Sequence, residues 1–152
     1  MAERTTGHSG MTPDAIEALA HRWHREICQE GNLALADELL APDVVIHGGG
    51  AEFRGVETAK QVAGIYKAAL PDLQITHHEA VVAGNRAAIL WTVDGTHQGD
   101  YLGYPPTGQR LHFEGLDLYH IEGDKITEMW IEVDSLAPLQ RAGAIPTPGQ
   151  AS

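Results

Sequence analysis

Asp117 is a carboxylate inside an apolar stretch, and this setting could make it a proton-transfer group. It stands between Leu116 and Leu118, two residues after Gly115. A carboxyl group surrounded by apolar side chains can act as a general base near neutral pH. Two interpretations stay open: Asp117 lines a pocket, where a bulge at Gly115 could help to aim it, or it faces solvent on the outer side of a strand.

Three further side chains could carry charge or protons, and each also has an ordinary structural interpretation. Asp94 precedes Gly95 near the end of a predicted strand, where a surface acid is expected. His97 follows at the same strand end and could act on a substrate or brace a loop through a hydrogen bond. His47 ends another apolar strand and could position a ligand.

His24 and Cys28 lie four residues apart and therefore share one face of a predicted helix. With His47 they could place two nitrogens and a sulfur around a metal ion. No ligand pair has the spacing of a metal-binding helix such as H-E-x-x-H, so we expect no metal. A nucleophilic thiolate would need a base and an electropositive setting, which the sequence does not display. We expect both residues to line the pocket or to pack beneath it.

Composition bounds the class of protein. The chain has 152 residues, of which 43% are hydrophobic and 20% charged, a balance typical of one globular domain with its own core. Acidic residues outnumber Lys and Arg by 21 to 10, and the resulting charge of −11 repels phosphate backbones and anionic lipids. We therefore expect no nucleic-acid or membrane partner. Cys28 is the only cysteine, which excludes an internal disulfide.

The ends of the chain differ from its middle. Residues 1–11 are polar and lack the apolar segment of a secretory signal, so we expect a flexible leader and a cytoplasmic location. A single domain is predicted over residues 12–144, followed by a flexible tail over 145–152. The sequence has no phosphate-cradling glycine loop, and we expect no metal, nucleotide or flavin cofactor.

Hydrophobic periodicity predicts helices first and strands after them. The predicted helices cover residues 13–30, 33–40, 56–70 and 136–142. The predicted strands cover residues 44–47, 73–82, 86–96, 111–121 and 126–133. This order indicates an α+β fold, in which N-terminal helices wrap a curved antiparallel sheet into a cone. The hollow of the cone is the expected binding site.

Short motifs in the second half of the chain form an ordered set. They are Gly95–Gly99 (GTHQG), Gly103–Gly108 (GYPPTG), Gly115–Tyr119 (GLDLY), Lys125–Trp130 (KITEMW) and Asp134. Their order and spacing resemble the SnoaL-like polyketide cyclases, a family of the nuclear-transport-factor-2-like superfamily. The resemblance covers about residues 15–145 and is more specific for the fold than for the reaction.

The resemblance implies a cofactor-free pocket for an apolar ligand that carries a carbonyl group. Cyclases of the family use carboxylate and histidine side chains for an intramolecular aldol ring closure, which needs a base and a donor to the developing oxyanion. Where they keep an acid/base aspartate, this chain has Ile131. Strand alternation places Ile131 on the apolar face with Met129 and Val133, and Glu132 on the opposite face.

The sequence therefore predicts a small-molecule enzyme of the cyclase or isomerase type. Asp117 is the expected base, and His97 and Asp94 are further catalytic candidates. The residues expected to bind the substrate are His47, Tyr119, Ile131, Met129, His24, Cys28 and Trp91.

Two alternatives remain open, together with an expectation about assembly. One alternative is an epoxide or ester hydrolase of the limonene-epoxide hydrolase type, with a water held by Asp94 and Asp117. The other is a ligand-binding module that kept the cone and lost the chemistry, which Ile131 favours. Trp130 has the outward parity of its strand, and with the pairing habit of the family this predicts a sheet-to-sheet homodimer.

Overall fold

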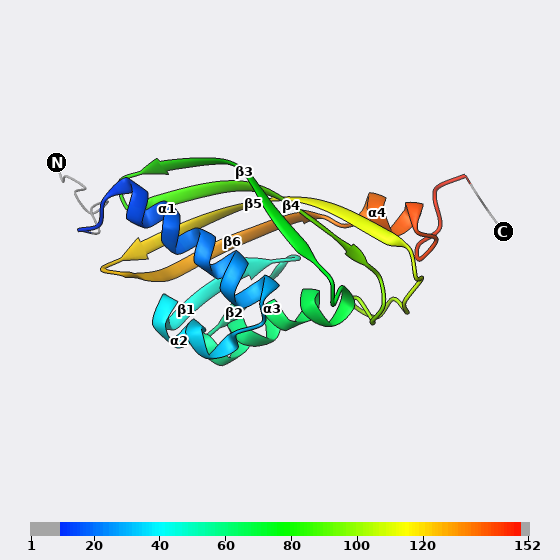
Figure 1. The fold of residues 1–152 in the computed structure, drawn as a ribbon, viewed down its shortest axis with the longest axis horizontal. Helices are drawn as coiled ribbons and strands as arrows, with labels where there is room; N and C mark the ends of the chain where they lie inside the picture. Colours follow the sequence, from blue (N-terminus) through cyan, green and yellow to red (C-terminus); the bar gives the residue numbers. More distant parts are fainter. Residues whose placement is uncertain (1–9, 150–152) are drawn as a thin grey trace.

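Residues 10–149 are described by a computed structural model, in which helices cover one face of a curved sheet (Figure 1). The helical segments in chain order are α1 (Pro13–Arg22), a π-helix (Trp23–Gln29), a 3₁₀ turn (Leu33–Leu35), α2 (Ala36–Leu39), α3 (Val56–Ala69) and α4 (Leu136–Arg141). α1, α2 and α3 lie on the same side of the sheet, and α4 lies at one end of it (Figure 1). The predicted α+β architecture is confirmed.

The first helix begins where its sequence predicts. The Thr12 side-chain oxygen accepts a hydrogen bond from the Ala15 N–H at 3.1 Å, and Pro13 occupies the first turn. The cap satisfies one of the N–H groups that have no partner within the helix, and proline has no N–H to lose there.

The sheet has six strands in the order β2-β1-β6-β5-β4-β3. The strands are β1 (Leu40–Gly48), β2 (Ala51–Arg54), β3 (Gln74–Ala83), β4 (Arg86–Thr96), β5 (Arg110–Glu122) and β6 (Lys125–Asp134). β3 to β6 pair antiparallel, as predicted, whereas β1 pairs parallel with β6. The sheet is therefore mixed rather than purely antiparallel. No hairpin joins β1 to β6, because half of the chain lies between them, so neither direction is imposed by a turn.

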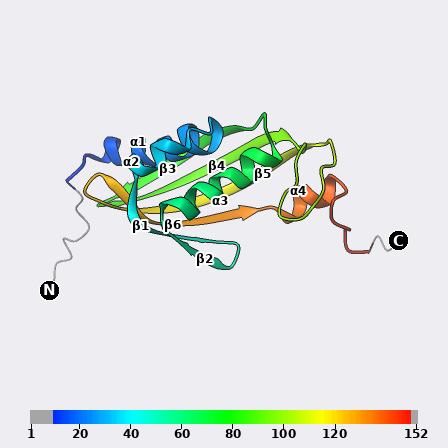
Figure 2. The ribbon, with the colours of Figure 1, turned by 90° about the horizontal axis from the view of Figure 1, so that it is seen from below.

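β2 is a short edge strand that the sequence pattern does not predict. A two-residue loop, Gly49 and Gly50, joins it to β1, and both glycines have positive φ, 59° and 80°. Hairpins with this conformation at both central positions favour glycine. β2 extends away from the rest of the sheet at its edge (Figure 2). Its four residues are mostly exposed, so they carry little of the hydrophobic signal on which strand prediction depends.

The core extends slightly beyond the predicted domain of residues 12–144. Met11 and Ile145 are partly buried and pack against the core cluster. The rest of the predicted leader, residues 1–9, and residues 150–152 of the predicted tail lie outside the described residues. Among the helices of residues 10–149, none has the length and apolar character needed to cross a membrane.

Candidate active site

Asp117 lies in the middle of β5 with its side chain on the helix-covered face of the sheet. It is 0% exposed, and the inward positions Phe113 and Tyr119 of the same strand are equally buried. Its register partners are Ile89 on β4 and Ile131 on β6. Of the two interpretations left open by the sequence, the structure selects the inward one. Its catalytic role remains a prediction.

The inward aim of Asp117 does not depend on a bulge at Gly115. The register between β4 and β5 is continuous along their whole length, so the suggested bulge is absent. Gly115 instead makes room for Trp91, its register partner, because an added Cβ would lie 2.2 Å from the Trp91 Cζ2 atom. The glycine lets the Trp91 ring lie across β5 next to the position of Asp117.

Two side chains hold one oxygen of Asp117. The Tyr119 hydroxyl donates to Asp117 Oδ2 at 2.6 Å, and His24 Nε2 lies 2.8 Å from the same oxygen. The Tyr119 hydroxyl also lies 3.2 Å from His24 Nε2, so the three groups form a closed triangle. Burial and the neighbouring Asp117 raise the pKa of Tyr119 well above its usual range. Tyr119 therefore stays protonated and serves as a permanent donor.

His24 and Cys28 reach the site from the π-helix that continues α1. In this segment the Glu30 N–H donates to the Arg25 carbonyl, five residues earlier, at 2.9 Å. The wider turn of a π-helix brings residues four apart close to one line, and such segments often occur at functional sites. His24 and Cys28 are both buried and both line the same pocket. Their predicted role in substrate binding stays a prediction.

Cys28 is not a thiolate in this environment. Burial is the main cause that raises the pKa of its thiol far above the usual value, and the charge of Asp117 acts in the same direction. A nucleophilic cysteine requires a lowered pKa, so Cys28 is a neutral part of the pocket wall.

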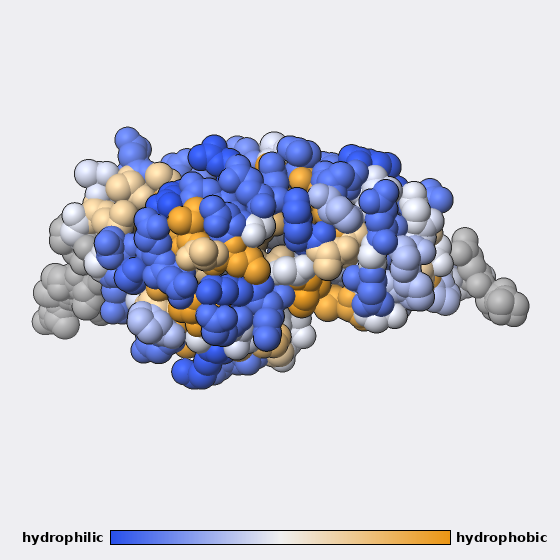
Figure 3. Space-filling view, turned by 60° about the horizontal axis from the view of Figure 1, so that its bottom comes forward, coloured by the Kyte–Doolittle hydropathy of each residue, from blue (hydrophilic) through white to orange (hydrophobic). Residues whose placement is uncertain are grey.

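The inner pocket is lined mainly by apolar side chains and has an empty volume of about 410 Å³, open space at its mouth included. Beside Asp117, His24 and Cys28, its walls are Trp23, Val62, Ala63, Tyr66, Leu73, Ile75, Trp91, Val93 and Ile131. Apolar residues gather around a hollow on the helical side of the molecule (Figure 3). Apolar walls with a few polar groups among them are typical of a small-molecule site.

An outer pocket adjoins the inner one. It has an empty volume of about 910 Å³, open solvent included, and shares Val62, Tyr66 and Ile131 with the inner pocket. Tyr101 and Leu102 of the loop between β4 and β5 also line it. Val62, Tyr66 and Ile131 therefore lie between the two pockets.

Two polar atoms that belong to residues of the inner pocket are buried and have no hydrogen-bond partner among residues 10–149. They are Asp117 Oδ1 and Trp91 Nε1. Unpaired polar groups in an apolar interior are costly and rare, so a site that keeps an acceptor and a donor free is suited to a ligand that pairs with both.

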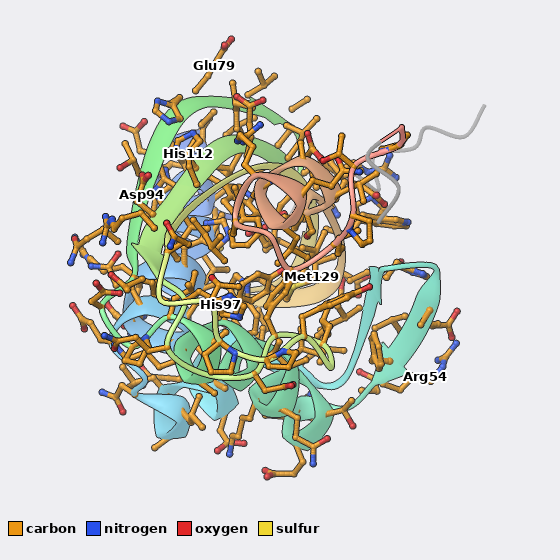
Figure 4. All side chains as sticks on the ribbon, turned by 90° about the vertical axis from the view of Figure 1, so that its right-hand side faces the viewer. Arg54, Glu79, Asp94, His97, His112 and Met129 are labelled. Atoms are coloured by element: carbon orange, nitrogen blue, oxygen red, sulfur yellow. The ribbon has the colours of Figure 1, made fainter. Side chains whose placement is uncertain are left out.

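Asp94 lies on the opposite face of the sheet from this pocket. Its side chain is 42% exposed and pairs with His112 at 2.7 Å on the outside of the molecule (Figure 4). The expectation that Asp94 and Asp117 hold a water together is therefore wrong. The reason is that side chains alternate between the two faces along a strand. The neighbouring positions on β4 point inward, so Asp94 points outward.

His97 is buried but does not line either pocket, and its ring braces the loop between β4 and β5. The Thr107 N–H donates to His97 Nδ1 at 3.3 Å, and the Thr107 hydroxyl lies 3.1 Å from the same nitrogen. The structure thus favours the bracing interpretation over a catalytic one. Its ring lies between the sheet and the lower helical layer (Figure 4).

His47 and Met129 do not line the pocket either, which corrects their assignment to substrate binding. His47 Nε2 lies 2.6 Å from a Glu128 carboxylate oxygen, and its ring stacks on Trp130 with centroids 4.7 Å apart. Met129 is fully buried in the core. Trp91, Ile131, His24 and Cys28 do line the pocket, and Tyr119 reaches it through its bond to Asp117.

The side chains of His24, Cys28 and His47, which were considered as ligands of a metal ion, do not lie together. Among residues 10–149 there is no group of three or more His, Cys, Asp or Glu side chains placed to hold a metal ion. His47 belongs to the outer face with Glu128, whereas His24 and Cys28 line the inner pocket.

His77 is part of the site but was not considered in the sequence analysis. Its Nε2 atom lies 2.7 Å from His24 Nδ1. A signal for it does exist, since Leu73, Ile75 and His77 alternate along one strand and therefore share a face. Leu73 and Ile75 line the inner pocket.

Comparison with known proteins gives the family. The SnoaL-like polyketide cyclase family pattern matches residues 18–141, most of the chain. A solved structure from Jannaschia sp. CCS1, described as a SnoaL-like polyketide cyclase, has a TM-score of 0.80 and 21% identity, covering 90% of this chain and 98% of that one.

Two proteins of Streptomyces are also similar. IdmH of Streptomyces antibioticus, described as a polyketide cyclase, has a TM-score of 0.72 and 27% identity, covering 88% of this chain and 99% of its own. AclR of Streptomyces galilaeus, described as a hydroxylase, has a TM-score of 0.76 and 25% identity, covering 90% of this chain and 85% of its own. No curated protein matches the chain. The pattern match across most of the domain, together with this fold, shows that the chain belongs to the SnoaL-like polyketide cyclase family.

Proposed function

We propose that this protein is a cyclase-type enzyme that takes a proton from carbon next to a carbonyl group of an apolar substrate, with Asp117 as the base. The observation that carries the proposal is the buried, unpartnered Oδ1 atom of Asp117 at the inner pocket. The other oxygen is occupied by Tyr119 and His24, which fixes the carboxylate plane. A base held in this way has one free oxygen for the substrate.

The residues support the two halves of a carbon-acid reaction. Asp117 Oδ1 accepts the proton from carbon, while the Trp91 N–H donates to the carbonyl oxygen on which negative charge develops. In ring closure, the enolate carbon then bonds to a second carbonyl carbon of the same molecule. The π electrons of that carbonyl move to its oxygen, which takes the proton back from Asp117. Protons and electrons balance without another reactant.

The pocket favours a neutral, largely apolar substrate. Its walls apart from Asp117 and His24 are aromatic, aliphatic or neutral side chains. The strongly acidic chain, at −11, also disfavours anionic ligands. An aromatic or polyketide-like compound with carbonyl groups fits both conditions, and the relatives described as polyketide cyclases support this class.

A simple ketone fused to an aromatic ring tests the proposal without knowledge of the natural substrate. The substrate is β-tetralone that carries deuterium on the carbon between the ring and the carbonyl group. We expect the protein to remove this deuterium, and mass spectrometry measures the rate of its loss. Asp117→Asn keeps the size of the side chain and removes its basicity, so the rate should fall at least about a hundredfold. Asp94→Asn is the matched control, because that carboxylate lies on the outer face, and it should leave the rate unchanged.

The outcomes separate the alternatives. Equal rates for the wild type and Asp117→Asn would overturn the assignment of the base. No deuterium removal by the wild type, combined with an increase of its melting temperature by β-tetralone, would instead support a ligand-binding module without catalysis.

A further inference from the structure

A chain of short contacts leads from Asp117 away from the pocket and towards the opposite side of the helix layer. His24 Nε2 lies 2.8 Å from Asp117 Oδ2, and His24 Nδ1 lies 2.7 Å from His77 Nε2. The His24 side chain is 5% exposed and that of Asp117 is 0% exposed, whereas His77 is only half-buried. Both ring nitrogens of His24 are thus engaged, one with a buried acid and one with a histidine that reaches solvent.

His77 opens into a separate hollow on the surface. This hollow is lined by His21, Arg25, Gln29, Ile75 and His77, and it shares only Ile75 with the inner pocket. Val62 and Tyr66, which adjoin the outer pocket, do not line this hollow. A proton from solvent at His77 can pass to His24 without crossing the space that a substrate would fill.

We propose that His77 is the proton port of the active site, through which His24 exchanges a proton with solvent whenever the charge of Asp117 changes. The proposal rests on the proposed function for its catalytic meaning, but the port itself is a property of the free protein. His77 acts through His24 and does not touch the substrate, so it is a positioning and relay residue.

The physical reason is the cost of net charge in a buried site. A buried carboxylate and imidazolium compensate each other, whereas either one alone is strongly unfavourable. In the proposed cycle His24 is the positive partner of charged Asp117, so when Asp117 Oδ1 takes a proton from carbon, the charge on His24 loses its compensation. Release of the His24 Nδ1 proton to His77 Nε2, with loss of the His77 Nδ1 proton to water, keeps the site neutral.

The return step restores the starting state. Once Asp117 gives its proton to the product oxygen, its charge reappears. A proton from water then enters at His77 Nδ1, the Nε2 proton of His77 moves to His24 Nδ1, and the buried ion pair forms again. Each transfer moves one proton between atoms that are 2.7 Å apart or in contact with solvent.

The charges that face His77 favour its neutral form. A residue that accepts a proton from His24 must be in this form. Burial lowers the pKa of His77 to about 4, and His24, His21 and Arg25 act in the same direction. Asp117 is the one group that opposes them. The His21 ring is tilted by 46° against the His77 ring, with centroids 4.0 Å apart, and His21 Nε2 lies 3.5 Å from a Glu17 carboxylate oxygen.

A measurement on the unliganded protein tests the port. In isotope-labelled protein, the exchange of the His24 ring protons with water is followed by nuclear magnetic resonance. His77→Phe blocks the hollow and should slow this exchange at least about tenfold. The amide oxygen of His77→Gln can still accept a hydrogen bond from His24 Nδ1, but the amide cannot take up and pass on a proton, so this variant should slow exchange by a similar factor.

The Gln variant separates relay from support. If His77→Gln exchanges as fast as the wild type, His77 only orients His24 and the proposal is overturned; unchanged exchange in His77→Phe overturns it as well. His78→Gln is the matched control, because the neighbouring His78 lies on the other face and bonds to Thr92 Oγ1. It should exchange like the wild type, and melting temperatures confirm that each variant is folded.

The deuterium removal assay adds the catalytic consequence. His77→Gln should remove deuterium from β-tetralone about tenfold more slowly than the wild type, with its Michaelis constant unchanged. If the His77 variants exchange the His24 ring protons slowly but the wild type does not remove deuterium, the proton port is supported and the proposed function is refuted. An active wild type with normal activity and exchange in His77→Gln would refute the port alone.

Discussion

Asp117 and Ile131 face each other as direct register partners on β5 and β6, and both line the inner pocket. By the resemblance to the cyclases, Ile131 stands where the family keeps an acid/base aspartate. The carboxylate of this chain therefore lies one strand away from the usual position, on the same row of the sheet. The site keeps a single acid in nearly the same place and fills the other position with an aliphatic wall.

Ile131→Asp should place a second carboxylate beside the first. Two carboxylates on neighbouring register positions of a buried site cannot both stay ionised. They will therefore share a proton and offer both an acid and a base. We expect a several-fold faster deuterium removal from β-tetralone and a loss of about 1–3 kcal/mol in the free energy of unfolding. Val133→Asp, on the same strand and parity but in the outer pocket, is the control. An equal gain in that variant would contradict a specific effect at position 131.

Gly115→Ala should destabilise the protein through Trp91. The new Cβ would overlap the indole ring at 2.2 Å, so the ring or β5 must shift. We expect a loss of about 1–3 kcal/mol in urea unfolding, as for an overpacked core. Gly64→Ala is the control, because nothing lies within 4 Å of its added Cβ and it stands inside α3. That change should stabilise by up to about 1 kcal/mol; equal effects of the two changes would contradict the argument.

Stability should fall on acidification partly because of His77. Its folded-state pKa of about 4 lies below the ordinary value of 6.5, so the unfolded chain binds more protons between these two values. Stability from this group is fully present above pH 6.5 and is lost progressively as the pH falls towards 4. His77→Gln should therefore lose less melting temperature than the wild type between these values. A parallel loss in both proteins would show that His77 does not titrate as argued.

We propose that the outer face of the sheet forms a homodimer. Leu116 and Val81 are 52% and 58% exposed, and Trp130 lies on the same face, stacked on His47. Light scattering at micromolar concentration should give about twice the 16.4 kDa mass of the chain. Leu116→Glu should shift this mass to the monomer. Leu102→Glu is the control, since Leu102 is 62% exposed but lies in the loop between β4 and β5; a monomeric wild type would refute the interface.

Activity should not depend on an added metal ion. The polar groups of the residues that line the inner pocket are one carboxylate, one imidazole, a neutral thiol, the Tyr66 hydroxyl and the indole N–H groups of Trp23 and Trp91, a poor donor set for a tightly held cation. Dialysis against a chelator should leave the rate of deuterium removal unchanged. Loss of activity that zinc or iron restores would contradict this and would assign His24 and Cys28 as ligands.

The sequence by itself determined most of the helices and strands, and it narrowed the orientation of Asp117 to two choices. Thr12, Gly31 and the helical spacing between them indicated the first helix, and alternation along residues 111–121 placed Asp117 on one face with Phe113 and Tyr119. These signals are local, because they depend on side-chain periodicity of 3.6 or 2 residues. The ordered motifs added the fold family.

Only the tertiary structure decided which polar residues meet. His24 and Asp117 are 93 residues apart and His24 and His77 are 53 apart, and no local pattern reports a contact across such distances. The π-helical turn that aims His24 has no signal in hydrophobic periodicity, and the parallel pairing of β1 with β6 is set by the packing of the whole sheet. Asp94 and His97 carry the same chemistry as the site residues, but the strand pleat and the loop after β4 direct them elsewhere. Residue type and local spacing limit what a side chain can do, whereas long-range packing selects its partners and so its role.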